Sequence, residues 1–232
     1  MKLGLLLASP PELPEPAEVY RAASDAMRRK DDVYLYLVDE GVRNLDRPEI
    51  EELRKGGIKL FACAYGAKRR KIAWDSDKAT FSGLTVLVDM IAGCDEFLAF
   101  TPLGVSPRGT AQKKSSSLPR TLITITEDPG ESHRPAEAVR IGAGIGGWKK
   151  TEVDFLLHGP ASKILSPYAD EWVDGENYEH YIPLVREWKR PVLLAPDAED
   201  FTELAESETT HQRCTEAQVK QLTDAASFFI PF

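Results

Sequence analysis

The chain alternates short, continuously apolar runs with longer amphipathic or polar stretches. Apolar runs at residues 2–8, 33–38, 59–63 and 96–100 have the length and composition of strands that are buried on both faces. Stretches with a helical pattern lie at residues 17–27, 49–54 and 82–91. Because strands and helices alternate, the pattern predicts an α/β fold with a mainly parallel sheet and helices on both of its faces.

The same pattern occurs a second time in the chain. Residues 121–129 repeat residues 2–10 at a constant offset of 119, and Pro135 then falls on Pro16 without a gap. Residues 226–232 match residues 94–100 when the two halves are counted back from their ends. We therefore predict a tandem duplication of two flavodoxin-like domains, at residues 1–101 and 121–232. Residues 102–120, rich in Pro, Ser and Lys, are predicted to be an exposed linker.

The two halves differ where the first half has its most distinctive residues. The third apolar run of the second half places Pro196 on Cys63 and is followed by no basic cluster. The second half also has about a dozen extra residues, acidic and aromatic, centred on residues 166–181. This insertion is interpreted either as a solvated loop or as a lid or docking surface.

Composition and charge exclude several classes of function. A net charge of −8 leaves no basic excess for nucleic acid or anionic membranes. No apolar run approaches the length of a membrane-spanning helix. The 3 cysteines lack paired spacing and indicate a reducing, cytoplasmic setting, and the 4 histidines lack the spacing of metal ligands. We therefore expect no metal and no cofactor, and partners that are proteins or small molecules.

One glycine motif has the form of a nucleotide-binding fingerprint. Residues 142–147 satisfy G-x-G-x-x-G, but they lie about fifteen residues beyond the preceding strand rather than directly after it. By the repeat they overlie the interior of the first helix. We predict a closely packed helix face there and no nucleotide.

Cys63 has the strongest candidate chemistry in the chain. It ends an apolar strand and precedes a stretch that has the composition of a first helical turn, with Lys68, Arg69 and Arg70 close behind it. Unpaired N–H groups at a helix start and nearby cations both favour a thiolate over a thiol. The alternative is that Cys63 is a small apolar side chain packed at the end of a strand.

The other two cysteines, Cys94 and Cys214, differ from Cys63 in their positions along the strands and helices. Cys94 opens the fourth strand whereas Cys63 closes the third, so parallel strands would hold the two thiols about 15–20 Å apart, too far for a disulfide. Cys214 stands beside Arg213 and His211 and precedes a predicted capping box, Thr215 to Gln218. That setting is expected to lower its thiol pKa, which makes Cys214 a candidate second reactive thiol.

The residues around Cys63 resemble a known family. The sequence Cys-Ala-Tyr-Gly-Ala-Lys-Arg-Arg at residues 63–70 resembles the cysteine loop of the DsrE and TusD branch of DsrE/DsrF-like proteins. Residues 56–58, 81–84 and 95–98 are similar to the same family, although Lys71 stands where a glycine often follows the basic pair. The resemblance covers the first half, and it extends to the second only through the repeat.

The resemblance implies a sulfur carrier, or sulfurtransferase. In that reading Cys63 accepts a persulfide sulfur and passes it to a partner protein, while Ala64, Tyr65 and the bases Lys68, Arg69 and Arg70 stabilise the anion. It also implies a homo-oligomer and a second half that acts without a thiol of its own. Two alternatives remain open: a non-catalytic interaction subunit, and a small-ligand binder at the carboxyl edge of the strands.

Overall fold

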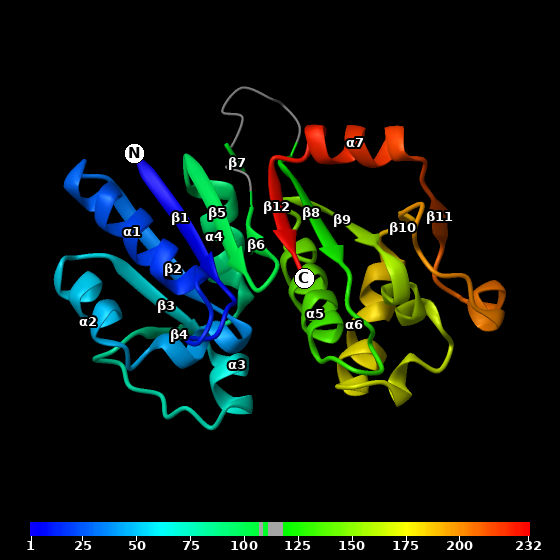
Figure 1. Cartoon of the computed structure of the whole chain (residues 1–232), viewed down its shortest axis with the longest axis horizontal. Helices are drawn as coiled ribbons and strands as arrows, with labels where there is room; N and C mark the ends of the chain where they lie inside the picture. The colour runs from blue at the N-terminus through cyan, green and yellow to red at the C-terminus, as the bar shows by residue number, and fades with distance from the viewer. Residues whose placement is uncertain (107–108, 111–117) are drawn as a thin grey trace. The chain divides into compact units, whose positions relative to one another are not determined.

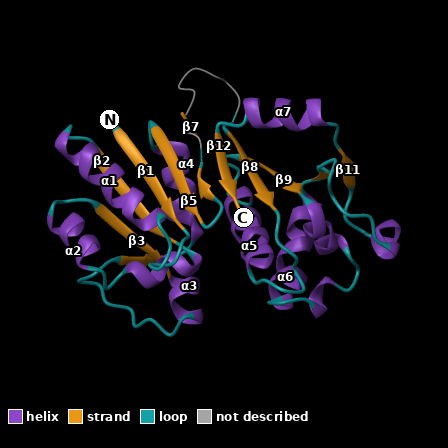
Figure 2. Ribbon diagram, viewed as in Figure 1, coloured by secondary structure: helices purple, strands orange, loops and turns teal. Residues whose placement is uncertain are grey.

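The computed structural model describes residues 1–106, 109–110 and 118–232 and divides into two compact units, Met1–Ser117 and Leu118–Phe232 (Figure 1). Each unit has one mainly parallel sheet flanked by helices (Figure 2). The predicted α/β class, with two flavodoxin-like domains, is confirmed.

The first unit alternates strands and helices from its first residues. Its strands are β1 (Lys2–Leu7), β2 (Asp32–Leu37), β3 (Lys59–Cys63), β4 (Thr80–Ser82), β5 (Glu96–Thr101), β6 (Gly104–Val105) and β7 (Gly109–Thr110). Its helices are α1 (Glu15–Arg28), the 3₁₀ helix η1 (Asp39–Asn44), α2 (Pro48–Lys55), α3 (Ala64–Arg69) and α4 (Leu84–Gly93). Five of the six residues of β1 are buried, as its continuous apolar run predicts.

The strand order places the helices of the first unit on both faces of its sheet. The order is β4-β3-β2-β1-β5-β6, in which β1 to β5 run parallel, whereas β6 and β7 pair antiparallel with β5. From β1 to β4 the chain moves across the sheet in one direction, so right-handed crossovers place α1, α2 and α3 on one face. The connection from β4 back to β5 runs in the opposite direction and places α4 on the other face. Gly4 lies on the α4 side, where an added Cβ would meet the ring of Phe97 at 2.7 Å.

Part of the predicted linker belongs to the sheet of the first unit. Within residues 102–120, β6 and β7 extend that sheet beyond β5, and β8 begins at Arg120. The rest of the prediction falls partly on residues 107–108 and 111–117, which lie outside the described residues.

The second unit has a sheet of the same order. Its strands are β8 (Arg120–Ile125), β9 (Glu152–Leu157), β10 (Val192–Leu194), β11 (His211–Arg213) and β12 (Phe228–Pro231), ordered β11-β10-β9-β8-β12 and all parallel. Its helices are α5 (Arg134–Gly146), η2 (Gly159–Leu165), η3 (Ala169–Glu171), α6 (Gly175–Glu187), η4 (Thr202–Glu206) and α7 (Glu216–Ala225). Figure 2 shows α7 apart from the neighbouring helices α5 and α6.

The glycine motif of the second half lies inside α5, as predicted. A Cβ added at Gly142 would meet the Phe155 ring at 2.2 Å, and one added at Gly146 would meet Trp188 at 2.5 Å. These glycines therefore allow α5 to approach the sheet and the end of α6 closely.

The acidic insertion is anchored to the second unit rather than freely solvated. Its residues form η3 and the first half of α6, and Tyr178 within it is only 1% exposed. The indole of Trp172 donates to the Lys163 carbonyl at 3.3 Å, and Gly175 packs directly on the backbone of Asp170. Among the residues that the structure describes, no helix is long and apolar enough to cross a membrane.

Candidate functional site

The carboxyl ends of the central strands of the first unit meet at one edge of its sheet. Because β1, β2 and β3 are parallel, the loop after β1, the helix η1 and the helix α3 all start at this edge. The side chain of Asn44 connects two of them, since its Nδ2 donates to the carbonyls of Ser9 and Gly41, each at 3.0 Å. Cys63, at the end of β3, therefore lies at the same edge of the sheet as the loop after β1.

Cys63 lies at the junction between β3 and α3, as predicted. It is the last residue of β3 and the N-cap of α3, and its Sγ accepts a hydrogen bond from the Gly66 N–H at 3.5 Å. This donor is the third residue after the cysteine and follows Ala64 and Tyr65 directly. An N–H group at a helix start that is directed at sulfur favours an anionic form of that sulfur.

The Cys63 side chain is buried. The residue is only 1% exposed, and its neighbours Ala62 and Gly66 are buried as well. A hollow of about 300 Å³ in the same unit is lined by Lys2, Tyr34, Cys94 and others, but it does not include Cys63. A reagent or partner can reach the thiol only if the surrounding segment opens.

The bases that follow Cys63 have different surroundings. Arg70 pairs with the carboxylates of Asp39 and Glu40, and its Nε lies 2.8 Å from a Glu40 oxygen. Arg69 donates to the Tyr65 hydroxyl at 3.3 Å, and its guanidinium lies 5.8 Å from that ring. Lys68 and Lys71 are exposed. The charge of Arg70 is thus shared with two carboxylates, and the role of Lys68, Arg69 and Arg70 toward the sulfur stays a prediction.

Asp39 and Glu40 are site residues that the sequence analysis missed. They follow β2 directly and begin η1, and Asp39 is 1% exposed with a left-handed backbone, at φ 52°. Through Arg70 they hold α3 against η1, and Gly66 packs on this helix with its Cα side facing Val42 and Asp39. The sequence could have pointed to them, because two acidic residues follow the predicted strand at residues 33–38. Side chains at the carboxyl end of a parallel strand are often part of a functional site.

Tyr36 and Ser82 were missed as well. Cys63 and Ser82 are register partners on β3 and β4, and the buried Tyr36 hydroxyl donates to the carbonyls of Ser82 and Gly83, at 3.3 and 3.0 Å. The Ser82 Oγ is buried and has no hydrogen-bond partner among the described residues. A polar hydroxyl therefore lies on the strand next to the cysteine, in a segment that the pattern assigned to a helix start.

The remaining cysteines are packed, and all three are free thiols. Burial raises the pKa of Cys94 to about 11. Cys214 is 5% exposed in an apolar cluster with Leu122, Leu156 and Leu193, and burial raises its pKa as well. The expectation of a lowered Cys214 pKa is thus wrong.

The cations near Cys214 are engaged elsewhere. The Arg213 guanidinium binds the carbonyls of Ala195 and Ala198 and the carboxylate of Asp200, and His211 contacts the Thr209 carbonyl. The capping box that starts at Thr215 is confirmed.

Comparison with known proteins agrees with the geometry of the first unit. Residues 1–100 match the sequence model of the DsrE/DsrF-like family. No curated protein matches the chain. The matched stretch begins with β1, contains the Cys63 junction and ends in β5, so it covers all five parallel strands of the first sheet. Residues 1–100 of this chain therefore form a domain of the DsrE/DsrF-like family.

Proposed function

We propose that this chain is a persulfide carrier of a sulfur relay, with Cys63 as the residue that holds the sulfur. Membership of the first unit in the DsrE/DsrF-like family connects the chain with sulfur relay in general. The observation that carries the finer proposal is the position of Cys63 as the N-cap of α3, with the Gly66 N–H directed at its Sγ. Sulfur at a helix start is the setting in which thiolates and persulfide anions are stabilised.

The reaction is an exchange between sulfur atoms without net oxidation. The Cys63 thiolate attacks the terminal sulfur of a donor persulfide, a new S–S bond forms, the S–S bond of the donor breaks, and the donor leaves as a thiolate. An acceptor thiolate then attacks the terminal sulfur on Cys63 and releases the Cys63 thiolate. In the thiolate the Gly66 N–H is directed at the Sγ that carries the charge.

The burial of Cys63 adds a requirement to this proposal. A thiol that is 1% exposed exchanges sulfur only after α3 moves away from η1. The return of α3 to η1 would then protect the bound sulfur from small thiols between transfers. The pairs of Arg70 with Asp39 and Glu40 are the contacts that such an opening would break.

The first unit exposes side chains that a partner protein could contact. Trp74 is 64% exposed and stacks on Phe81, with the ring centroids 5.9 Å apart, and Lys68 and Arg69 are exposed on α3. Large aromatic side chains and arginine are both enriched at protein interfaces. We propose that a sulfur donor or acceptor protein binds there, in the cytoplasm, and that the chain itself assembles as a homo-oligomer.

A second candidate function rests on the burial of Cys63 alone. A thiol that never becomes accessible would make this chain a non-catalytic interaction subunit of a sulfur relay, with Cys63 packed for stability. The two functions differ in whether sulfur is ever bound covalently.

Intact-mass spectrometry after incubation with glutathione persulfide separates these functions. We expect the full chain to gain one sulfur atom, and Cys63→Ser to gain none. The matched controls Cys94→Ser and Cys214→Ser remove equally buried thiols and should keep the adduct. A wild-type chain that gains no sulfur, or an adduct that survives in Cys63→Ser, would overturn the carrier proposal.

A further inference from the structure

The second unit contains a pocket that has no part in the sulfur chemistry proposed above. It has a volume of about 350 Å³ and lies between the 3₁₀ helices η2 and η3, helix α6 and the segment that precedes β11. The residues of the acidic insertion, which the first unit lacks, form one of its walls. A volume of this size is typical of small-molecule sites.

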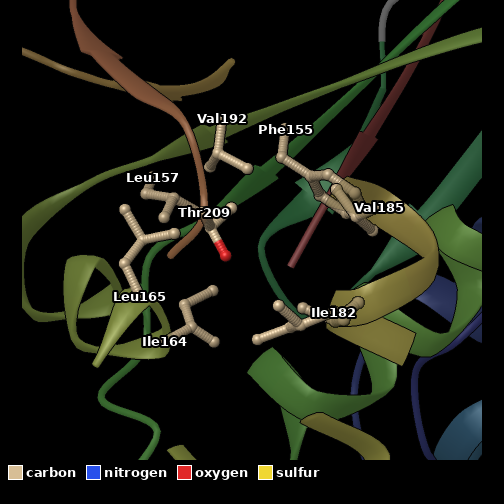
Figure 3. Close-up of a pocket in the computed structure, with 9 residues that line it drawn as sticks. Phe155, Leu157, Ile164, Leu165, Ile182, Val185, Val192 and Thr209 are labelled. Carbon is tan, nitrogen blue, oxygen red and sulfur yellow. The ribbon is translucent and has the colours of Figure 1, made fainter. Parts of the chain in front are cut away.

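An apolar recess continues the pocket toward the sheet. Figure 3 shows Phe155 and Leu157 of β9, Val192 of β10 and Val185 of α6 turned toward a common space. The recess is small, about 20 Å³, and it shares Ile164, Leu165, Ile182 and Thr209 with the larger pocket. The apolar end of the pocket at these shared residues therefore suits a hydrocarbon group, whose removal from water is favourable.

The mouth of the pocket has an excess of negative charge. Asp170, Glu179 and Glu208 line it together with one cation, Arg186. Arg186 is already paired with the Glu208 carboxylate, and its Nε donates to the Thr209 hydroxyl at 3.1 Å. Asp170 and Glu179 are exposed, and within the described residues neither takes part in an ion pair, so two carboxylate charges remain at the mouth.

Tyr178 adds a buried polar group to the lining of the same pocket. The residue is 1% exposed, and its hydroxyl has no hydrogen-bond partner among the described residues. Burial is the main cause that raises the pKa of Tyr178, and the carboxylates of Asp174 and Asp128 raise it further. The hydroxyl therefore stays neutral, and the charges that act on it are negative. A neutral phenol oxygen in negative surroundings accepts a hydrogen bond from a cation.

We propose that this pocket binds a small primary amine that carries a short hydrocarbon chain. The chain lies in the pocket along Ile164, Leu165 and Ile182 with its end toward the recess, and the ammonium group remains at the mouth between Asp170 and Glu179. An apolar inner end with a negative mouth discriminates such an amine from an alcohol of the same length and, more strongly, from a carboxylate.

The experiment uses isothermal titration of the full chain with hexylamine, 1-hexanol and hexanoate at low ionic strength. Hexylamine should bind about tenfold more tightly than 1-hexanol, because two carboxylates attract its charge, and hexanoate should bind least. The double variant Asp170→Asn with Glu179→Gln should lower the hexylamine affinity about tenfold, to the level of 1-hexanol, and leave 1-hexanol unchanged. Both substituted residues are exposed, so folding is preserved.

Two further variants complete the test. Glu187→Gln removes one carboxylate charge on α6 outside the pocket lining and should leave all three affinities unchanged. Ile182→Trp, at the passage between pocket and recess, should abolish binding of hexylamine and 1-hexanol alike, with folding checked by circular dichroism. Equal binding of hexanoate and hexylamine, no binding of hexylamine, or a hexylamine affinity unchanged in the double variant would overturn the proposal. The result does not depend on Cys63, whose sulfur chemistry is tested separately.

Discussion

Lys71, which follows α3, has a backbone conformation that is unfavourable for a residue other than glycine. It follows α3 with a left-handed backbone, at φ 55°, while the N–H of Lys71 binds the Lys68 carbonyl and the N–H of Ile72 binds the Ala67 carbonyl. This pair of hydrogen bonds is the Schellman ending of a helix, in which glycine is the favoured residue at the left-handed position. Lysine at that position costs about 1–2 kcal/mol of conformational energy, and its charge at the helix end recovers about 0.3–1 kcal/mol.

We predict that Lys71→Gly stabilises the protein. The conformational term is the larger one for an exposed side chain, so the free energy of unfolding should rise by about 0.5–1 kcal/mol. Lys68→Gly is the matched control, because it removes the same side chain inside α3 and should lower the free energy of unfolding by about 1 kcal/mol. Urea unfolding of both variants measures the difference, and a destabilised Lys71→Gly would contradict this account.

The positions of single residues at the end of β3 and α3 could be predicted from the sequence. The pattern placed Cys63 at the end of its strand, and the resemblance marked Lys71 as a residue where the family often has glycine. Asp39 escaped notice because its importance comes from Arg70, which lies 31 residues later in the chain. A pair so distant leaves no local pattern, and its geometry depends on how β2 and β3 align.

At the scale of elements, α3 is a short helix whose position depends on its contacts with η1. It has only 6 residues, too few to be stable by itself, and Arg70 binds it to Asp39 and Glu40 at the start of η1. The Asp39 side chain is 1% exposed, so the loss of Arg70 removes a cationic partner from a buried carboxylate, which is strongly destabilising.

We predict that Arg70→Gln opens α3 and exposes Cys63. The free energy of unfolding should fall by about 3 kcal/mol, and Cys63 should react with iodoacetamide about tenfold faster than in the wild type. The rates of Cys94 and Cys214 are internal controls, since local opening leaves them unchanged whereas global unfolding accelerates all three. Lys78→Gln, which breaks the exposed pair with Asp46, should change none of the rates.

An equal acceleration of the three cysteines in Arg70→Gln would show that α3 does not open separately. It would also weaken the carrier proposal, because that proposal needs local access to Cys63.

The elements that the sequence analysis missed are short or sit at the sheet edge. β4 and β11 have three residues each, which is too short for a period-two pattern to be recognised. The basic run at residues 68–71 shows a different limit of sequence patterns: successive helical residues point about 100° apart, so the sequence does not show which of four neighbouring bases face the sulfur atom.

At the scale of the whole chain, the five parallel strands of the two sheets have the same order. Both have the order in which the fourth strand forms one edge and the fifth pairs with the first, and both enter their first 3₁₀ helix through a left-handed residue, Asp39 in η1 and Gly159 in η2. We infer that the chain arose by duplication of one domain, which is the organisation that the repeated pattern predicted.

The hydrogen-bond register corrects the alignment of the two halves by one residue. Leu37 pairs with Ala62 in the first sheet and Leu157 pairs with Leu194 in the second, so Ala195, and not Pro196, corresponds to Cys63. By the same register Cys214 corresponds to Ser82, because its N–H donates to the Leu194 carbonyl at 2.7 Å. Continuous apolar runs have no polar face, so the sequence alone could not set their register.

The register also leads to a prediction about a thiol placed in the second half at the position that corresponds to Cys63. Ala195 is fully buried and is followed by Pro196, which has no N–H. The third residue after it, Ala198, uses its N–H for the Ala195 carbonyl at 3.0 Å, whereas the equivalent Gly66 N–H is directed at the Cys63 sulfur. A thiol at position 195 would therefore lack the stabilising donor that Cys63 has.

We expect that Ala195→Cys, placed in a Cys63→Ser background, gains no sulfur from glutathione persulfide when its intact mass is measured. Restoring Cys63 in the same Ala195→Cys chain should restore one sulfur atom, which controls for any effect of the substitution on folding. A cysteine at position 195 that accepts sulfur as readily as Cys63 would show that the end of a parallel strand is sufficient. The helix start after Cys63 would then not be what makes its thiol reactive, because both cysteines end a strand at the carboxyl edge but only Cys63 caps a helix.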